Sequence, residues 1–210
     1  GNTNVPLMEL DEETLRIDRR LSALDEAVLS FVDVLESCEV EYVIVSGYVA
    51  ILTGRSRATE DVDVILEELT QAETDALVET LTERDYWGMA MPLEDMYSML
   101  SRGDRIRIAE AEEFYPNFEV FFPSTEIERT ALADSLTVAF DSGTIEISPI
   151  ELQIAYKLQL AQRADSPDGK DMEDALHLYV TFEEAFNTET LESYVTRLGV
   201  EDYYGRLRRI

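Results

Sequence analysis

The sequence predicts an α+β fold, with a mixed sheet flanked by helices and a helical C-terminal half. Three observations support this prediction. A β-branched run ends in a tight turn and a short helix over residues 42–54, further strand-like runs follow between residues 105 and 148, and continuous helical periodicity begins after Ser148. We therefore expect two units, an α/β domain over residues 1–147 and a helical domain over residues 148–210 packed on it.

The first part of the chain alternates between helical and strand-like patterns. Apolar residues recur at three and four positions over residues 21–37, which predicts an amphipathic helix. YVIVSG predicts a strand ending at Gly47, and YVAILTG predicts a two-turn helix that Gly54 closes in a left-handed conformation. EDVDVILEE predicts the next strand. Thr70 and Glu73 then form a capping box at the start of another helix.

The middle of the chain adds strands to the sheet. RIRIA at residues 105–109 and NFEVFFP at residues 117–123 predict a pair of strands joined by a polar turn. A short helix is expected over residues 127–133, and SLTVAF and TIEIS predict a hairpin around residues 141–143. Between residues 87 and 100 the pattern favours no single structure.

The C-terminal part has helical patterns throughout. Ser148 is expected to be an N-cap, Pro149 the first helical residue and Glu151 the second half of a capping box. The helix after them is followed by a second one, KDMEDALHLYV. Two further helices are expected over residues 191–198 and 201–207.

Charge is the most unusual feature of the composition. The 210 residues include 45 acidic and 17 basic ones, which gives a formal net charge of −28, and Lys157 and Lys170 are the only lysines. The acidic residues are spread along the whole chain, which argues against an acidic interaction tail. Concentrated salt screens such a surface, with a Debye length of about 3 Å at 1 M, so the composition predicts a protein from a high-salt organism.

The residue content excludes several classes of site. Cys38 is the only cysteine and His177 the only histidine, so neither a disulfide framework nor a zinc site made of these residue types can form. We expect His177, on a helix, either to pack or to face solvent, and not to act as a base. No apolar run approaches the roughly 20 residues that cross a bilayer, and the first residues lack a signal-peptide pattern. We expect a cytoplasmic protein without a membrane partner.

Two aspartates interrupt the predicted strand DVDVIL. Asp61 and Asp63 share one face because successive side chains of a strand alternate. In so acidic a chain an Asp-x-Asp pair alone carries little information, and two surface aspartates on an edge strand are the alternative. Here the pair follows the turn Ser46-Gly47, where a helix start can bind phosphate oxygens, and Glu119 stands among apolar residues of a later strand. Three carboxylates beside such a turn indicate Mg²⁺-assisted phosphoryl or nucleotidyl transfer.

Two long motifs resemble a known family. YVIVSGYVAILTGRSRATEDVDVIL resembles the signature of the nucleotidyltransferase superfamily that includes DNA polymerase β, in particular its small bacterial and archaeal branch related to AbiEii-type toxins. The shared parts are a turn containing glycine, a short helix, a Gly-Arg-x-Arg-x-Thr return and Asp-hydrophobic-Asp. SPIELQIAYKLQLAQRADSPDGKDMEDAL resembles the C-terminal pattern of that branch, a helix carrying a lysine followed by Lys-Asp-x-x-Asp. The two motifs span about residues 42–176.

The resemblance implies a nucleotidyltransferase-like fold and assigns roles to the motif residues. One or two Mg²⁺ ions are implied, with Asp61, Asp63 and Glu119 as ligands. The implied catalytic residues are Asp61, Asp63, Glu119, Lys157 and Asp174. The implied nucleotide-binding residues are Ser46, Gly47, Arg57, Lys157, Lys170 and Asp171. Asp174 with Asp171 is expected on the acceptor side of the cleft, and both lysines of the chain fall on motif positions, although each could instead cap or salt-bridge a helix.

The implied reaction is attack of an acceptor hydroxyl on the α-phosphate of a nucleoside triphosphate, with release of pyrophosphate. The acceptor stays open among tRNA, a protein side chain and a small hydroxylated molecule, because the acidic surface offers no basic stripe for RNA. Arg55 and Arg57 are expected either to bind the triphosphate or an acidic acceptor, or to pair with Glu60 or Asp61.

The alternative function is a nucleotide-binding regulatory protein that keeps the fold without catalysis, such as one partner of a toxin–antitoxin pair. Two departures from the family pattern motivate it. The turn is Ser46-Gly47 where relatives usually have Gly-Gly or Gly-Ser, and the third acidic residue is Glu119 where aspartate is common.

Overall fold

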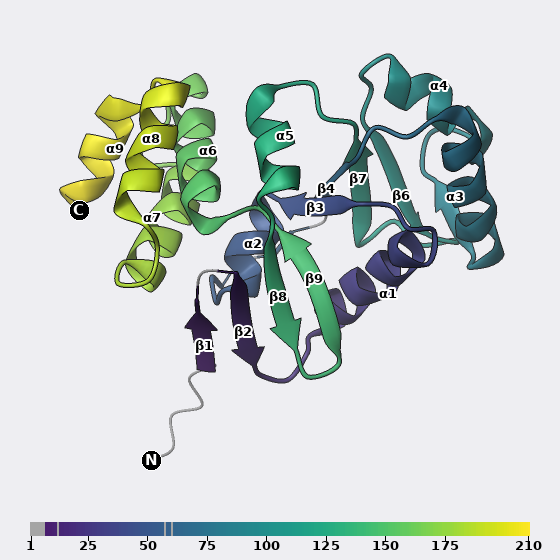
Figure 1. The fold of residues 1–210 in the computed structure, drawn as a ribbon, viewed down its shortest axis with the longest axis horizontal. Coiled ribbons are helices and arrows are strands. Elements are labelled where there is room, and N and C mark those ends of the chain that lie inside the picture. The colour runs from purple at the N-terminus through teal and green to yellow at the C-terminus, as the bar shows by residue number, and fades with distance from the viewer. Residues whose placement is uncertain (1–6, 12, 57, 60) are drawn as a thin grey trace.

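The structure, a computed structural model, describes residues 7–11, 13–56, 58–59 and 61–210, so Arg57 and Glu60 lie outside the described residues. In this part of the chain one mixed sheet runs through the molecule, with helices around it and a group of helices at the C-terminal end (Figure 1). The strands are β1 (Leu7–Leu10), β2 (Thr14–Asp18), β3 (Tyr42–Val45), β4 (Asp61–Leu66), β5 (Tyr86–Gly88), β6 (Ile106–Glu110), β7 (Asn117–Phe121), β8 (Leu136–Phe140) and β9 (Gly143–Ile147). The helices are α1 (Ala23–Ser37), α2 (Gly47–Leu52), α3 (Gln71–Glu83), α4 (Met96–Ser101), α5 (Glu126–Ala133), α6 (Ile150–Arg163), α7 (Lys170–Phe182), α8 (Thr188–Leu198) and α9 (Glu201–Arg208), with a 3₁₀ turn at Leu93–Asp95.

The strand order brings segments that are distant in sequence side by side. The order is β1-β2-β8-β9-β3-β4-β7-β6-β5. β3 and β4 are antiparallel, as are β6 and β7, whereas β2 and β8, β3 and β9, and β4 and β7 pair in parallel. β3, β4 and β7 are therefore neighbours in the middle of the sheet, although a long segment containing α3 and α4 separates β4 from β7 in the chain.

The two faces of the central strands differ in character. Val62 and Val64 of β4 are buried on one face, where Phe118 of β7 stacks on Phe31 of α1 with ring centroids 4.1 Å apart. Asp61 and Asp63 point to the other face, which α5 and α6 cover only in part. This alternation is the one expected from DVDV, because side chains of a strand alternate between its faces.

The C-terminal helices pack mainly on one another and on α2. α6 contacts α7, α8 and α9, and α7 also contacts α2, which directly follows β3. Their core consists of apolar side chains such as Ile154, Leu158, Leu178 and Leu191, all fully buried. α6 therefore reaches the residue that follows β3, where Lys157 lies 3.4 Å from the Ser46 hydroxyl, and α7 reaches α2.

Most predicted elements are confirmed, including the Thr70 capping box and the hairpin of β8 and β9. The Ser148 cap is wrong. α6 begins after Pro149, whose carbonyl accepts the first helical N–H, and no side chain caps it. Ser148 is fully buried and donates its N–H to the Ile44 carbonyl, so its backbone belongs to the sheet. Glu151 instead accepts the N–H of Asn187.

In the part of the chain that the structure describes, no helix combines the length and the apolar character needed to cross a membrane.

A buried carboxylate ties the start of α1 to β2 and α2. Asp25 is 1% exposed, accepts the Tyr48 hydroxyl at 2.7 Å and the Ser22 N–H at 2.8 Å, and pairs with Arg19. Burial by itself raises the pKa of Asp25, but the bonds from Arg19, Ser22 and Tyr48 outweigh it and hold the pKa below the usual 3.8.

We expect Asp25→Asn to lower the free energy of unfolding by about 2 kcal/mol at neutral pH, because it replaces charged hydrogen bonds. The lowered pKa means that the wild-type advantage is present above about pH 4 and is lost as the pH falls through the folded-state value. Urea unfolding of both proteins from pH 7 downward measures this. A gap that stays constant with pH would contradict the role given to the charge.

Candidate active site

The register of three strands gathers the predicted carboxylates at one place. β4 pairs with β7 so that Asp61 lies beside Asn117 and Asp63 lies beside Glu119. On its other side β4 pairs with β3, where Val45 is the partner of Asp63. Since Val45 is the last residue of β3, the acidic pair lies next to the turn that starts α2. The sheet pairing therefore brings Glu119 and the two aspartates of the motif into one site.

Asp63 and Glu119 form a strongly interacting pair. Burial and, to a smaller extent, the neighbouring negative charge of Glu119 together raise the pKa of Asp63 to about 6, although the positive charge of Arg105 opposes them. Two carboxylates that resist joint ionisation are stabilised together by a bound cation.

Asp61 is oriented less tightly. Its carboxyl group is 40% exposed and lies 3.9 Å from the Arg107 guanidinium of β6. Among the described residues no group of three or more histidine, cysteine, aspartate or glutamate side chains is arranged to hold one metal ion. The donor set nevertheless fits Mg²⁺, because this ion commonly takes one or two protein carboxylates and completes its shell with water and substrate phosphates.

Lys157 of α6 brings the second motif to the same turn. Its ammonium group lies 3.4 Å from the Ser46 hydroxyl, 3.0 Å from Asp174 and 3.2 Å from Asp171. Lys157 is 2% exposed and Asp174 0%. Within the described residues, the only other buried charged side chain is Asp25. Burying a charged side chain is costly unless the charge is paired. Here the buried ammonium of Lys157 and the buried carboxylate of Asp174 pair with each other.

Arg55 is part of this network. It pairs with Asp174 and with Glu173, both on α7, and not with Asp61. The chain leaves α2 through Gly54, whose φ of +111° is unfavourable for other residues, and this turn directs Arg55 toward α7. His177 of α7 supports the same contact, with Nε2 3.2 Å from the Thr53 carbonyl, and burial lowers its pKa. His177 is thus a packing residue, the first of the two expected alternatives.

Lys170 stands apart from these contacts. Lys170 is exposed at the first residue of α7, one helical turn before Asp174, and shares a helix face with it. Arg57 lies outside the described residues, so the structure does not place it.

The turn between β3 and α2 has an unusual backbone. Ser46 has φ +71° and ψ −139°, a region that favours glycine and costs roughly 1–3 kcal/mol for other residues. Its N–H donates to Gln153 Oε1 at 3.2 Å, and Gln153 Nε2 donates to its carbonyl at 3.0 Å. The Ser46 amide is therefore already used, and the polar group that this residue can offer a phosphate is its hydroxyl.

Sequence reasoning missed three residues of the site. Gln153 reads as an ordinary helix residue, but it is fully buried against Ser46. Arg105 lies 3.9 Å over the Phe121 ring, and it opposes the pKa increase of Asp63. Burial raises the pKa of Tyr156 of α6, and the nearby positive charge of Arg105 opposes this increase. For Arg105, the sequence did hold a signal: Arg105 and Arg107 alternate in RIRIA, so both side chains are expected on one face of the strand.

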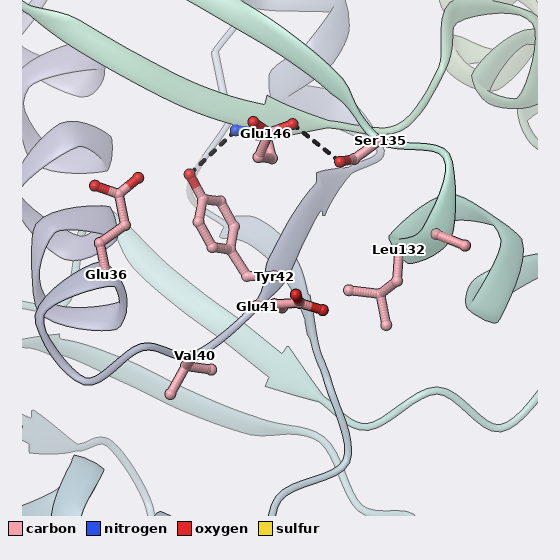
Figure 2. A pocket seen from close by; sticks show the side chains of 8 residues that line it. Glu36, Val40, Glu41, Tyr42, Leu132, Ser135 and Glu146 are labelled. Carbon is pink, nitrogen blue, oxygen red and sulfur yellow. Dashed lines mark hydrogen bonds between the residues drawn. The ribbon is translucent and has the colours of Figure 1, made fainter.

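A separate hollow of about 450 Å³ lies at the other end of β3 and contains none of the predicted site residues. Figure 2 shows Tyr42 between Glu36 and Glu146, with the Glu146 N–H donating to the tyrosine hydroxyl at 3.1 Å and Ser135 donating to the Glu146 carboxylate at 2.9 Å. None of the described residues that line it is basic. An anionic nucleotide is repelled by such a lining, so we do not place the nucleotide here.

The fold has solved counterparts. An antigenic nucleotidyltransferase-like protein from Paracoccidioides brasiliensis is similar with a TM-score of 0.52 and 17% identity, over 90% of this chain and 94% of that one. The antibiotic-resistance factor ANT(2'')-Ia is similar with a TM-score of 0.51 and 16% identity, over 88% of this chain and 94% of that one. At these identities the likeness shows the fold alone. The sequence matches no family model and no curated protein.

Proposed function

We propose that this chain, which has a nucleotidyltransferase-like fold, is a Mg²⁺-dependent nucleotidyltransferase. The observation that carries the proposal is the register of β4 and β7, which sets Asp63 beside Glu119 next to the Ser46 turn. The buried Lys157, 3.4 Å from the Ser46 hydroxyl, supports it, because it puts a cation beside a turn suited to phosphates.

Each residue has a role in the proposed reaction. Of the three predicted ligands, Asp63 and Glu119 lie side by side and would hold Mg²⁺, with Asp61 on the same face of β4; when bound, the ion neutralises charge on the triphosphate. Lys157 and the Ser46 hydroxyl bind phosphate oxygens, with Gly47, Arg57, Lys170 and Asp171 around them. Glu119 takes the proton of the acceptor hydroxyl as its oxygen bonds to the α-phosphorus. The bond from that phosphorus to the bridging oxygen breaks, and pyrophosphate leaves with its electrons.

The acceptor lies on the side of Asp174 and Asp171 in this proposal. tRNA, a protein side chain and a small hydroxylated molecule remain the candidates. RNA binding requires positively charged side chains that contact phosphates. Among the described residues, the exposed guanidinium groups of Arg105 and Arg107 lie beside the carboxylates and could make such contacts.

The test offers each nucleoside triphosphate, labelled at the α-phosphate, to the protein with Mg²⁺ in concentrated KCl. Total RNA, a protein extract and a pool of small hydroxylated molecules are supplied as separate acceptors, with Asp63→Asn as the matched variant. We expect label to enter one acceptor class with wild type only. Nucleotide binding without transfer to any class would favour the alternative, a non-catalytic partner of a toxin–antitoxin type.

We also propose that the protein works in concentrated salt, because its net charge is −28. The prediction is that the urea midpoint of unfolding rises as KCl is increased from about 0.1 M to about 2 M, since the Debye length falls from about 10 Å to below about 3 Å and self-repulsion is screened. Circular dichroism at a series of KCl concentrations measures it. A midpoint that is flat or falls across the series would contradict this part of the proposal.

A further inference from the structure

One side chain of the C-terminal helices holds both polar backbone groups of a single residue in the site. Gln153 of α6 accepts the Ser46 N–H at 3.2 Å and donates to the Ser46 carbonyl at 3.0 Å, across 107 positions of sequence. A side-chain amide carries a donor and an acceptor side by side, which this pairing needs. Gln153 is fully buried, so no water competes for these bonds.

The residue that Gln153 holds is in a strained conformation. Ser46 has φ +71° and ψ −139°, and the ψ value separates it from an ordinary left-handed turn residue. Such a conformation persists only where the surroundings fix it, and such strain concentrates at functional sites. The Ser46 carbonyl also accepts the Val49 N–H at 3.1 Å, but of the described contacts only Gln153 bonds both the N–H and the carbonyl of Ser46.

The same helix also holds the Ser46 side chain. Lys157, one helical turn after Gln153, lies 3.4 Å from the Ser46 hydroxyl. Residues four apart share a helix face, so α6 presents the amide and the ammonium group to one residue. Val45, just before Ser46, is the register partner of Asp63. The contacts that α6 makes with Ser46 therefore lie next to the carboxylates of Asp63 and Glu119.

We infer that Gln153 is a positioning residue that fixes the Ser46 turn for the triphosphate. It acts through Ser46 and touches no reacting atom. Its amide holds the strained backbone, and the Ser46 hydroxyl then points to Lys157, where phosphate oxygens bind. This inference rests on the proposed function, but the state of the turn can be measured without any substrate.

The experiment is a double-mutant cycle of Gln153→Met and Ser46→Gly. Methionine has a similar volume and removes both hydrogen bonds, while glycine adopts the positive φ without support. Gln162→Met is the matched control, because Gln162 lies on the same helix, is exposed and bonds the Gly199 carbonyl at 3.2 Å. Gln153→Asn, which is one methylene too short to make both bonds, replaces Gln153→Met if that variant does not fold.

Two readouts are taken. The first is hydrogen exchange of the residue 46 amide, expected to be about tenfold faster in Gln153→Met and unchanged in Gln162→Met. The second is KM against kcat for the triphosphate. We expect Gln153→Met to raise KM about tenfold with a smaller change in kcat, and the rise to shrink to about threefold or less when residue 46 is glycine.

Gln153→Met could raise KM by the same factor whether residue 46 is serine or glycine. That result would overturn the inference, because it is expected if Gln153 only packs against its neighbours and does not hold the backbone of residue 46. Unchanged exchange at residue 46 would overturn it as well, with or without enzymatic activity. Wild type that shows no turnover would instead contradict the proposed function, and the exchange measurement alone then decides whether Gln153 holds the turn.

Discussion

Asp63→Asn is expected to lower nucleotidyl transfer roughly a hundred- to a thousandfold while making the fold more stable. The loss of activity follows because the substitution removes one of the two carboxylates paired at the site. The gain in stability follows because the pKa of Asp63 is raised to about 6 from a usual 3.8. An ionised Asp63 is thus disfavoured in the folded protein, and a neutral amide removes that cost.

The sign of the effect can be checked with pH. A raised carboxyl pKa means that the folded state binds the proton more tightly, so wild-type stability falls as the pH rises from about 4 to about 6 and stays lower above it. At about pH 8 in EDTA we expect Asp63→Asn to be roughly 1–3 kcal/mol more stable than wild type, with the gap closing toward about pH 4.

Urea unfolding monitored by circular dichroism measures the stability difference. Asp61→Asn is the matched control for stability, because Asp61 is on the same strand but 40% exposed, and its change is expected within about 0.5 kcal/mol. Asp63→Asn with a lower stability than wild type at about pH 8, or with undiminished transfer, would contradict the assignment.

The second large effect concerns Asp174. Removing its carboxylate by Asp174→Ala is expected to lower the free energy of unfolding by about 3–5 kcal/mol. Lys157, 2% exposed, would keep only the Asp171 carboxylate at 3.2 Å, and Arg55 would keep only Glu173. A buried charge left without its nearest partner explains the size of this effect.

Glu173→Ala is the matched control on the neighbouring residue. Glu173 also pairs with Arg55, but its side chain is 58% exposed, so the change is expected within about 0.5 kcal/mol. The double variant with Lys157→Met and Asp174→Leu should recover much of the loss, since it removes both charges and fills the space. Equal destabilisation by Asp174→Ala and Glu173→Ala would show that the buried pair is not what stabilises this region.

Local patterns predicted most of the fold. The periodicity of α1 and the alternation in DVDVIL follow from the geometry of one element, so a single sequence is enough to read them. β1 and β2 were missed because they are short, are bounded by acidic residues and join the sheet by a parallel contact with β8, more than a hundred residues later. The Ser148 cap failed for a related reason, since its backbone is bonded to Ile44.

Part of the arrangement of the candidate site could be predicted from residue types. Acidic side chains on one strand face and a lysine on a helix point to a polar cleft, and sheet pairing does set Asp63 beside Glu119. The partners of Arg55 and the role of Gln153 were not predictable, because both depend on how α6 and α7 lie against the Ser46 turn. That arrangement is set by apolar packing over the whole C-terminal part.

The central proposal is that Asp61 and Asp63 take part in catalysing the attack of an acceptor hydroxyl on a nucleoside triphosphate. Its most direct test is pyrophosphate release from each triphosphate, with Mg²⁺ in molar KCl, by wild type and by the double variant of Asp61→Ala and Asp63→Ala, both confirmed to be folded. We expect release by wild type, with a preference for one nucleotide when the acceptor is present, and none above background by the variant. Release that persists unchanged in the variant would contradict the account.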